Sequence, residues 1–374
     1  MRRLLAIAML LCLTGCGEAG SAAKAKSADT GDTPPKSATP ASEASGDATP
    51  SAESTVATEP TAEREAPSPP AGKSMTADEL HAALRAANPG YQGDAQIVDN
   101  GGQIVAVGLA QLPISDLSPL AGLKLDILDI TQTPVADLAP LKGMPLTQFA
   151  AAGSRVEDLS PLAGMPLRTL DLLGAPVKDI APLAGMPLEE LYLDETRVSD
   201  LSPLAGMRLQ KLYLNNVPVA DLSPLAGMPL VELNLLGTDV RDLGPLSKSP
   251  LNMLWINESP VEDISPLAGL PIVSLSLSRT RVRDIGAARR MPLLQRLDIS
   301  ETPIGDLSLL GELKLTRLLF SPGYVKQGIE AIRGIPTMAE IGPTFEEKTS
   351  PDEFWRRYDG GEWRAASGPA APKP

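Results

Sequence analysis

A phrase of five residues recurs at a fixed distance along most of this 374-residue chain. It first reads Asp116-Leu-Ser-Pro-Leu, and every step to the next copy is 21 residues except the last, which is 22. The aspartates that open the copies are Asp116, Asp137, Asp158, Asp179, Asp200, Asp221, Asp242 and Asp263, with degenerate copies at Asp284 and Asp306. A unit this short cannot bury an apolar face alone, so successive units must stack on one another.

Apolar residues occupy fixed places within each unit. Between the phrases lies Met-Pro-Leu-x-x-Leu-x-Leu, as in Met165 to Leu172. In the unit 167–187 we expect these side chains to point inward: Leu167, Leu170, Leu172, Val177, Ile180 and Leu183. Phe149 and Ala151 are exceptions to the Leu, Ile or Val found at equivalent places. Each buried aliphatic side chain contributes roughly 1.5–3 kcal/mol, but only once neighbouring turns cover it.

This period and this leucine spacing are those of the leucine-rich repeat. We therefore predict an α/β repeat fold, a solenoid of 21-residue turns with a parallel β-sheet on its concave face and small caps at both ends. Strands such as 170–172 are expected to stack about 4.8 Å apart. The convex side has too few residues for full helices, so short 3₁₀ turns or extended chain are expected there.

Residues 114–320 resemble the internalin-type bacterial leucine-rich repeats, which carry Ile/Val-x-Asp-Leu-Ser-Pro-Leu once per turn but have a period one residue longer. The sequence Gly-Met-Pro-Leu is similar to the repeat motif of bacterial proteins whose leucine-rich repeats are often fused to serine/threonine kinases. The segments 84–91 and 99–105 resemble their entry cap, and Phe354 to Trp363 resembles their closing segment. No kinase signature accompanies the repeats. The resemblance implies binding and carries over no catalytic residue.

The first residues have the pattern of an export signal. Met1-Arg2-Arg3 is basic, and the apolar run 4–14 is too short to span a bilayer. The run ends in Leu13-Thr14-Gly15-Cys16, which resembles the bacterial lipobox. We therefore predict a lipoprotein signal peptide over 1–15 and a lipid on Cys16. The alternative is an ordinary signal peptide with a chance cysteine. Gly17, which replaces the inner-membrane retention aspartate of some bacteria, favours the outer membrane of the cell envelope.

A polar segment separates this signal from the repeats. Residues 17–74 are nearly all Ala, Ser, Thr, Pro, Gly and charged residues, and Val56 is their only large apolar side chain. Such a composition buries too little surface to offset chain entropy. We predict that 16–74 comprises the lipidated cysteine and a disordered tether, and that 364–374 is a disordered tail. The alternative to a functional tether is a passive spacer, and a disordered segment of this composition would have the same physical properties in either case.

Composition argues against an enzyme. The chain contains one histidine and two cysteines. Cys12 leaves with the signal peptide and Cys16 is acylated, so neither a disulfide framework nor a Cys-based zinc site is expected. His81 is expected to be solvated. The net charge of −13 argues against nucleic-acid binding. We predict a monomer without catalytic residues, metal or cofactor.

The repeated aspartate suggests two roles. It could form a metal-binding ladder, but stacked carboxylates repel one another and no partner column is evident. Aspartate before Leu-Ser-Pro-Leu can instead accept backbone N–H bonds and cap a tight turn. We predict the turn cap.

The N-terminal cap is predicted over 75–113. Thr76-Ala-Asp-Glu79 is a capping box, and Met75 with Leu80 can form a hydrophobic staple. The helix that follows is expected to end near Ala87, before Asn-Pro-Gly. Asn100-Gly101 predicts a hairpin.

The C-terminal cap is predicted over 321–363. Val325, Ile329 and Ile332 have the spacing of an amphipathic helix, and Ser350-Pro-Asp-Glu353 is a second capping box. The aromatic side chains that follow are expected to cover the last turn, since a bare sheet edge invites aggregation. They are Phe354, Trp355 and Tyr358.

Outward side chains of the strands form the candidate binding surface. The central column reads Asp129, Ala150, Asp171, Tyr192, Tyr213, Asn234, Trp255, Ser276 and Asp298. Aromatics are 3% of the chain, yet three of them occupy this column. Exposed Tyr and Trp often anchor interfaces. The predicted partner-binding residues are Tyr192, Tyr213, Trp255 and Asn234, flanked by Glu190, Asp194, Lys211, Asn215, Glu232, Met253 and Asn257. Alternatively, aromatics suit strands and their clustering is accidental.

A second candidate surface is basic. It comprises Arg279, Arg281, Arg283, Arg289, Arg290 and Arg296, offset only by Asp284. Such a cluster could meet phosphate head groups or an acidic partner. The alternative is ordinary solvated surface.

Together these patterns predict a lipid-anchored, non-catalytic scaffold that binds a protein partner through its concave face. The alternative is a cell-wall or glycan-binding surface protein, because the same aromatic column could stack on sugar rings.

Overall fold

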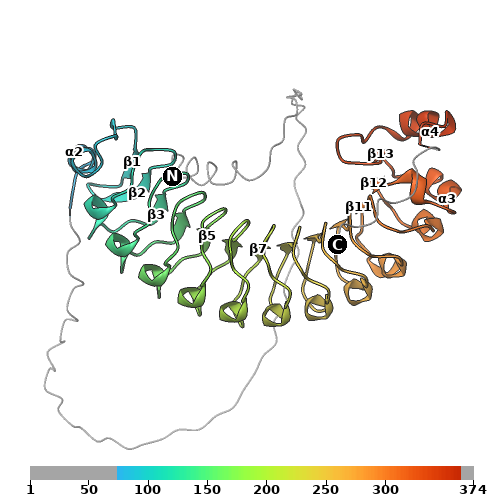
Figure 1. Ribbon diagram of the computed structural model, residues 1–374, viewed down its shortest axis with the longest axis horizontal. Helices are drawn as coiled ribbons and strands as arrows, with labels where there is room; N and C mark the ends of the chain where they lie inside the picture. Colours follow the sequence, from blue (N-terminus) through green and yellow to red (C-terminus); the bar gives the residue numbers. More distant parts are fainter. Residues whose placement is uncertain (1–73, 364–374) are drawn as a thin grey trace, which may run out of the picture. The chain divides into compact units, whose positions relative to one another are not determined.

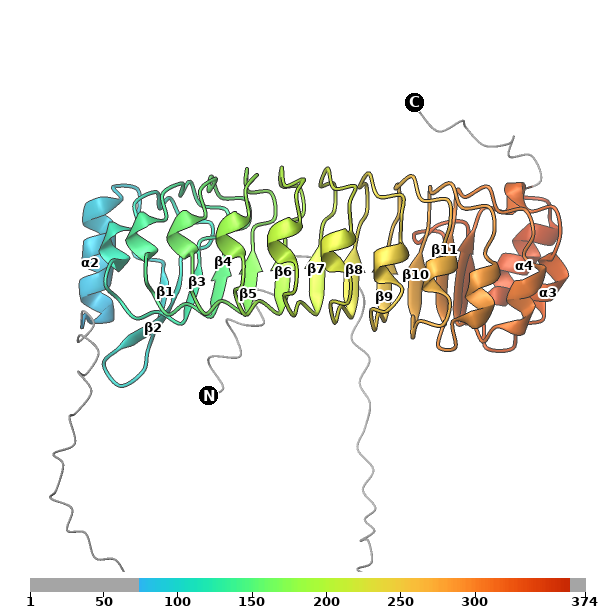
Figure 2. The same ribbon diagram turned by 90° about the horizontal axis from the view of Figure 1, so that it is seen from below.

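The computed structural model describes residues 74–363, which form a curved solenoid (Figure 1). The predicted signal peptide, Cys16, residues 17–73 and the tail 364–374 lie outside the described residues. Thirteen strands form one sheet in chain order, from β1 to β13. All neighbouring strands are parallel except β1 and β2. The strands line the concave side and the 3₁₀ turns the convex side (Figures 1 and 2), which confirms the predicted leucine-rich repeat solenoid.

The helices, strands and 3₁₀ turns of the described chain are short. The strands are β1 (Gln96–Asp99), β2 (Ile104–Gly108), β3 (Ile127–Asp129), β4 (Gln148–Ala150), β5 (Thr169–Asp171), β6 (Glu190–Tyr192), β7 (Lys211–Tyr213), β8 (Glu232–Asn234), β9 (Met253–Trp255), β10 (Ser274–Ser276), β11 (Arg296–Ile299), β12 (Arg317–Phe320) and β13 (Glu340–Gly342). The α-helices are α2 (Ala77–Ala87), α3 (Ile329–Arg333) and α4 (Pro351–Asp359). The 3₁₀ turns are η1 (Ser118–Leu120), η2 (Ala139–Leu141), η3 (Ser160–Leu162), η4 (Ala181–Leu183), η5 (Ser202–Leu204), η6 (Ser223–Leu225), η7 (Gly244–Leu246), η8 (Ser265–Leu267), η9 (Gly286–Arg290), η10 (Ser308–Glu312) and η11 (Pro322–Tyr324).

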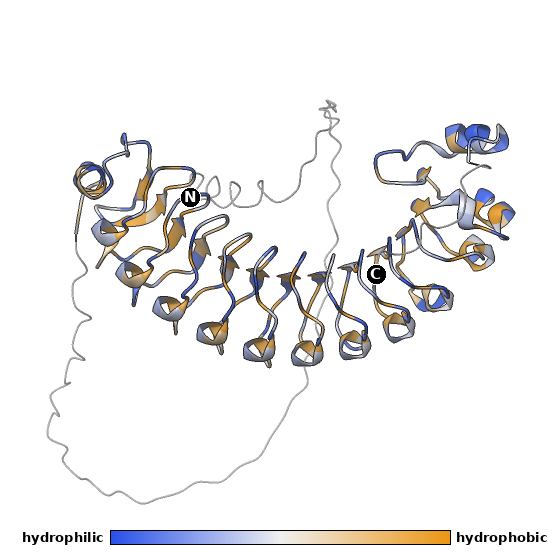
Figure 3. Ribbon diagram, in the orientation of Figure 1, coloured by the Kyte–Doolittle hydropathy of each residue, from blue (hydrophilic) through white to orange (hydrophobic). Residues whose placement is uncertain are grey.

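The core is a continuous stack of aliphatic layers. The six side chains predicted to point inward in the unit 167–187 are at most 2% exposed. Phe149 and Ala151 take the same inward places and are also buried. In Figure 3 the strands and the 3₁₀ turns carry hydrophobic residues beside hydrophilic ones. Because the middle residue of each three-residue strand points inward, its two neighbours project from the concave face.

The repeated aspartates cap the convex turns, as predicted. In each of the ten copies, Oδ1 accepts the backbone N–H two residues further on, at 2.7–2.9 Å. In some copies the serine hydroxyl donates to the same carboxylate, as Ser202 does to Asp200 at 2.8 Å. The backbone N–H and then the hydroxyl favour the charged carboxylate, and so they lower the pKa of Asp158, Asp200 and Asp263.

The single 22-residue step is absorbed in a turn. Strand β10 pairs Ser274 with Arg296, 22 positions away, whereas β11 pairs Arg296 with Arg317, 21 positions away. The extra residue lies after Met291. In the other turns that carry this methionine, a buried leucine follows it by two residues, whereas here the buried leucine is Leu294, three residues after Met291. Leu293 is left 48% exposed. The insertion therefore leaves the columns of the sheet aligned.

The N-terminal cap closes the first edge of the core. The predicted capping box is confirmed: Thr76 Oγ1 accepts the Glu79 N–H at 3.3 Å, and Glu79 Oε2 accepts the Thr76 N–H at 2.8 Å. Helix α2 buries Leu80 and Leu84. The predicted hairpin is formed by β1 and β2.

The expectation that His81 is solvated is wrong. The ring is partly buried, and its Nδ1 lies 2.6 Å from the Tyr91 hydroxyl, which also accepts the Ala95 N–H at 3.0 Å. His81 is therefore a structural contact inside the cap.

The C-terminal cap differs in two details from its prediction. Val325 lies outside a helix, and α3 begins only at Ile329, because Gly328 at its N-cap has φ +90°. Ser350 caps α4 by accepting the Glu353 N–H at 3.5 Å. Glu353 turns to Arg356 at 2.6 Å instead of completing the second capping box.

Aromatic side chains seal the last turn, as expected. Phe354 is fully buried, and its ring centroid lies 5.6 Å from that of Phe320 in β12. Trp355 and Trp363 each approach the Phe354 ring to 4.9 Å. Tyr358 lies 6.2 Å away. This cluster covers the apolar end that a solenoid would otherwise expose.

Candidate binding surface

Three strands bring the predicted aromatic residues into contact on the concave face. Tyr192 of β6 and Tyr213 of β7 are directly paired in the sheet, and their ring centroids are 5.0 Å apart. Tyr213 and Trp255 are 6.3 Å apart, although two strand spacings of about 4.8 Å separate them. The two rings therefore lean toward each other across Asn234 of β8. We call Tyr192, Tyr213 and Trp255 the aromatic cluster.

Carboxylates hold the two tyrosines. The Tyr192 hydroxyl donates to Glu190 Oε2 at 3.0 Å, and the Tyr213 hydroxyl donates to Glu232 Oε2 at 2.9 Å. Lys211 Nζ lies 3.1 Å from the other oxygen of Glu190. These contacts join three neighbouring strands and tether the hydroxyl groups of the two tyrosines. Three of the seven flanking residues predicted from the sequence, Glu190, Lys211 and Glu232, thus form a frame beside the two tyrosines.

A buried carboxylate lies beside this frame. Asp194 is 4% exposed, and its Oδ1 accepts the Asn215 N–H at 2.8 Å. Burial raises the pKa of Asp194 from 3.8 to about 6, and the charges of Asp171 and Glu195 add to the shift. Burial also raises the pKa of Asp171, with a further contribution from Asp129. This part of the face therefore holds negative charge that water solvates poorly.

Two buried acceptors flank the aromatic cluster. Asn215 and Asn257 follow Tyr213 and Trp255 by two residues. In both, Oδ1 is buried without a hydrogen-bond partner among the described residues. Buried polar atoms are nearly always hydrogen-bonded, so an exception calls for a reason.

The face carries a strong excess of negative charge. From the turn of β3 to that of β9, all within the described residues, the outward residues of each turn are the first residue of the strand and the residues two and four positions after it. Lys211 is the one cation at these places. The carboxylates are Asp129, Asp171, Glu190, Asp194 and Glu232. Met253, at the first place of β9, is the apolar neighbour of Trp255.

The six arginines do not form one patch. Arg289 and Arg290 lie in η9 on the convex side, whereas Arg296 lies in β11 on the concave sheet. Arg279, Arg281 and Arg283 follow β10 in the connecting turn. Three of the six are paired with carboxylates: Arg279 with Glu258 and Glu301, Arg281 with Glu262, and Arg289 with Glu312.

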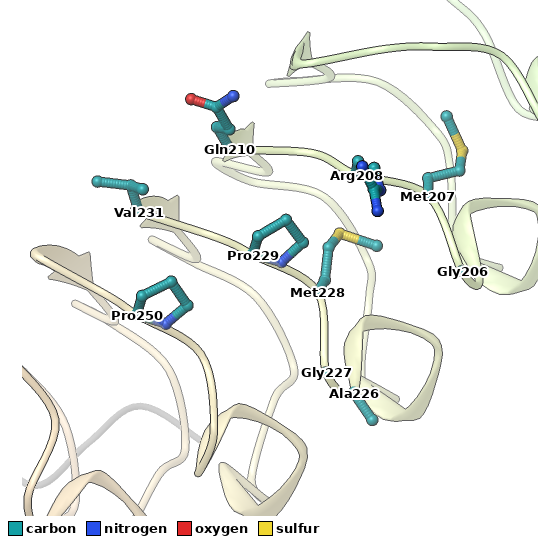
Figure 4. A pocket seen from close by; sticks show the side chains of 10 residues that line it. All are labelled: Gly206, Met207, Arg208, Gln210, Ala226, Gly227, Met228, Pro229, Val231 and Pro250. Atoms are coloured by element: carbon teal, nitrogen blue, oxygen red, sulfur yellow. The ribbon is translucent and has the colours of Figure 1, made fainter. Parts of the chain in front are cut away.

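An open groove of about 680 Å³ was not anticipated from the sequence (Figure 4). It lies where three turns enter their strands, between Arg208, Pro229 and Pro250. The sequence does carry a signal here, because Arg208 replaces the usual proline after Met207. Ser249, two turns after Met207, replaces the usual methionine and is buried, with its hydroxyl unpaired within the described residues.

Residues 74–363 contain neither a membrane-spanning helix nor a cluster of metal ligands. None of their helices is both long and apolar enough to cross a bilayer. Their His, Cys, Asp and Glu side chains form no group of three or more that could hold a metal ion.

No family model matches the chain, and no curated protein matches it. Several solved structures do match the chain. An internalin from Listeria monocytogenes matches with a TM-score of 0.54 and 23% identity, over 71% of this chain and 87% of that chain. The plant peptide hormone receptor RGFR1 in complex with RGF2 matches with a TM-score of 0.52 and 13% identity, over 67% of this chain and 48% of that chain. The described chain thus has the fold of the leucine-rich repeat proteins.

Proposed function

We propose that the chain is a non-catalytic scaffold that binds a protein partner on its concave face. The aromatic cluster carries this proposal. Tyr and Trp in a rigid setting present large contact areas at a low cost in conformational entropy, and such residues dominate binding energy at interfaces. The frame of Glu190, Lys211 and Glu232 holds the hydroxyl groups of the two tyrosines. The receptor with the same fold is itself bound to RGF2.

A glycan ligand is the alternative occupant. Sugar rings stack on open, flat aromatic faces. Here the rings of Tyr192 and Tyr213 are tilted by 37° and those of Tyr213 and Trp255 by 38°, and each pair is in contact. The cluster therefore offers edges and clefts more than a continuous platform, which favours a protein partner.

Substitution of Tyr192, Tyr213 and Trp255 by alanine is expected to weaken partner capture at least tenfold. Truncation of a single anchor commonly costs more than about 1 kcal/mol of binding free energy, and 1.4 kcal/mol is about tenfold in Kd. The partner would first be identified by crosslinking the tagged chain in its own cells, followed by mass spectrometry. Binding of the purified partner would then be measured by calorimetry.

A matched triple variant supplies the control. Lys178, Arg241 and Lys248 are exposed residues outside the strands, and their replacement by alanine should leave Kd unchanged. If the folded aromatic variant binds as well as the original chain, the proposed face is wrong. If it instead loses binding to purified wall polymer, the glycan alternative is correct.

We also propose that a lipid on Cys16 holds the scaffold at a bacterial membrane, in the outer membrane of the envelope, with residues 17–74 as its tether. The lipobox-like residues support this proposal. Replacement of Cys16 by serine is expected to move the chain from the membrane fraction to the soluble fraction, because a lipid anchor supplies about 0.8 kcal/mol per buried methylene group. Retention of the serine variant in the membrane fraction would exclude the anchor.

A further inference from the structure

The proposed function leaves open which chemistry the partner presents. Resting on that function, we infer that the aromatic cluster receives a cationic side chain of the partner, an arginine or lysine on an exposed segment, on the acidic face to which Asp194 and Glu232 belong. Three features of the face converge on this ligand: its acceptors, its ring faces and its charge.

The unpaired polar atoms around the cluster are acceptors. Asn215 Oδ1 and Asn257 Oδ1 are buried without a hydrogen-bond partner among residues 74–363. Glu232 receives the Tyr213 hydroxyl on one oxygen, and a carboxylate has sites for several more donors. A ligand that bonds to Glu232 has to supply donors. Lysine brings three N–H donors and arginine five, and neither side chain has an acceptor.

The aromatic rings attract the same kind of group. The faces of Tyr and Trp carry negative potential, and they bind a cation within about 6 Å of the ring centre. Tyr213 and Trp255 stand on either side of the shorter Asn234, with 6.3 Å between their ring centroids. A planar guanidinium that enters beside them can lie against one ring and still reach the carboxylates around it.

The charge of the face excludes the opposite ligand. Five outward carboxylates lie on the face between β3 and β9, and Lys211 lies 3.1 Å from one of them. Two of these carboxylates, Asp171 and Asp194, are held in a poorly solvated setting, which raises their pKa. A cation from the partner would relieve this cost, whereas a phosphate or an acidic peptide would increase it.

The test uses the full chain and two short glycine/serine peptides. One carries two arginines, and the other has citrulline in their place, which keeps the shape and removes the charge. Calorimetry at pH 7.5 and physiological salt is expected to detect binding of the arginine peptide and at least about tenfold weaker binding of the citrulline peptide, because cation–π and carboxylate contacts need the charge.

Charge-matched variants locate the site. The double variant Asp194→Asn, Glu232→Gln is expected to raise the Kd of the arginine peptide about tenfold, because both carboxylates lose their charge. The control is Asp239→Asn, Glu157→Gln, which removes the same charges from exposed residues outside the strands. It should change Kd less than about twofold.

Three results would overturn the inference: no binding of the arginine peptide, equal binding of the citrulline peptide, or equal weakening by the two double variants. The last would show general attraction to an acidic chain. If the inference fails while the alanine variant of the aromatic cluster still loses its protein partner, the scaffold function stands and only the cationic partner class is wrong.

Discussion

Replacement of Phe354 by alanine is expected to lower the free energy of unfolding by about 3–5 kcal/mol, the usual cost of removing a fully buried aromatic side chain. Phe354 is 0% exposed and lies at the centre of the C-terminal aromatic group. Its ring contacts Phe320 of the last regular turn and both tryptophans of the cap. Loss of this one side chain therefore leaves a cavity where helix α4 packs on the last turn and weakens the cover over the end of the core.

The measurement is urea unfolding followed by circular dichroism. A solenoid whose end is uncovered loses nearest-neighbour stabilisation there first, so an additional early transition is expected from the variant. Phe345→Ala is the matched control, because Phe345 belongs to the same cap but is 48% exposed, with Lys348 Nζ 3.8 Å above its ring. The control should cost less than about 1 kcal/mol. Equal stability of the Phe354 variant and the original chain would show that the cap does not hold the solenoid together.

Replacement of Asp194 by asparagine is expected to stabilise the fold at pH 7.5 by about 1–3 kcal/mol. Burial raises the pKa of Asp194 from 3.8 to about 6. One pKa unit corresponds to about 1.4 kcal/mol, so at pH 7.5 the folded chain bears the cost of a buried charge. Asparagine removes that charge, and its Oδ1 can still accept the N–H of Asn215.

The sign of the pH dependence follows from the same shift. Between pH 4 and pH 6 the folded carboxyl holds its proton while the unfolded one has lost it, since the folded pKa is the higher. The unfolded chain then binds fewer protons, so the Asp194 contribution makes the fold more stable as the pH falls toward 4. The asparagine variant should lose this contribution. The check is the free energy of unfolding of both chains at pH 7.5 and pH 5.

Asp200→Asn supplies a control of opposite sign. Asp200 caps a convex turn, and its hydrogen bonds from the backbone and the hydroxyl of Ser202 lower its pKa. Its contribution to stability is therefore present at neutral pH and lost in acid. Asparagine at position 200 should therefore lower the free energy of unfolding at neutral pH.

The prediction for Asp194 would be contradicted if its asparagine variant were less stable than the original chain and kept the original pH dependence. The Asp194 carboxylate would then not be a site of electrostatic cost.

Much of this architecture was predictable because it depends on local, repeated chemistry. The aspartate caps involve residues two positions apart, and the same bond recurs in ten turns. The identity of the central column follows from the two-residue periodicity of a strand. The residues of the aromatic cluster could therefore be named without a structure.

Contacts between turns were harder to predict from the sequence. Tyr213 leans toward Trp255 and donates a hydrogen bond to Glu232. Both contacts depend on the side-chain rotamer of Tyr213, which is set by residues of neighbouring strands. The arginines are close in sequence, but one solenoid turn passes through both faces, so Arg289 and Arg296 reach opposite sides.

The helix predicted from Val325 was interrupted by a contact that no periodicity shows. The chain of Ser308 approaches so closely that a Cβ on Gly328 would lie 2.2 Å from its backbone nitrogen. Glycine is required at that point, and the helix has to begin after it.

The unchanged step between strands has a consequence for how such a surface can vary. From Ala106 in β2 to Ser274 in β10, each strand pairs with the next at a distance of 21 residues. Duplication or loss of a whole turn would add or remove one residue from every concave column and leave the aliphatic layers matched. The length and chemistry of the face can therefore change by recombination of turns, whereas a single inserted residue has to be accommodated outside the sheet, as Leu293 is.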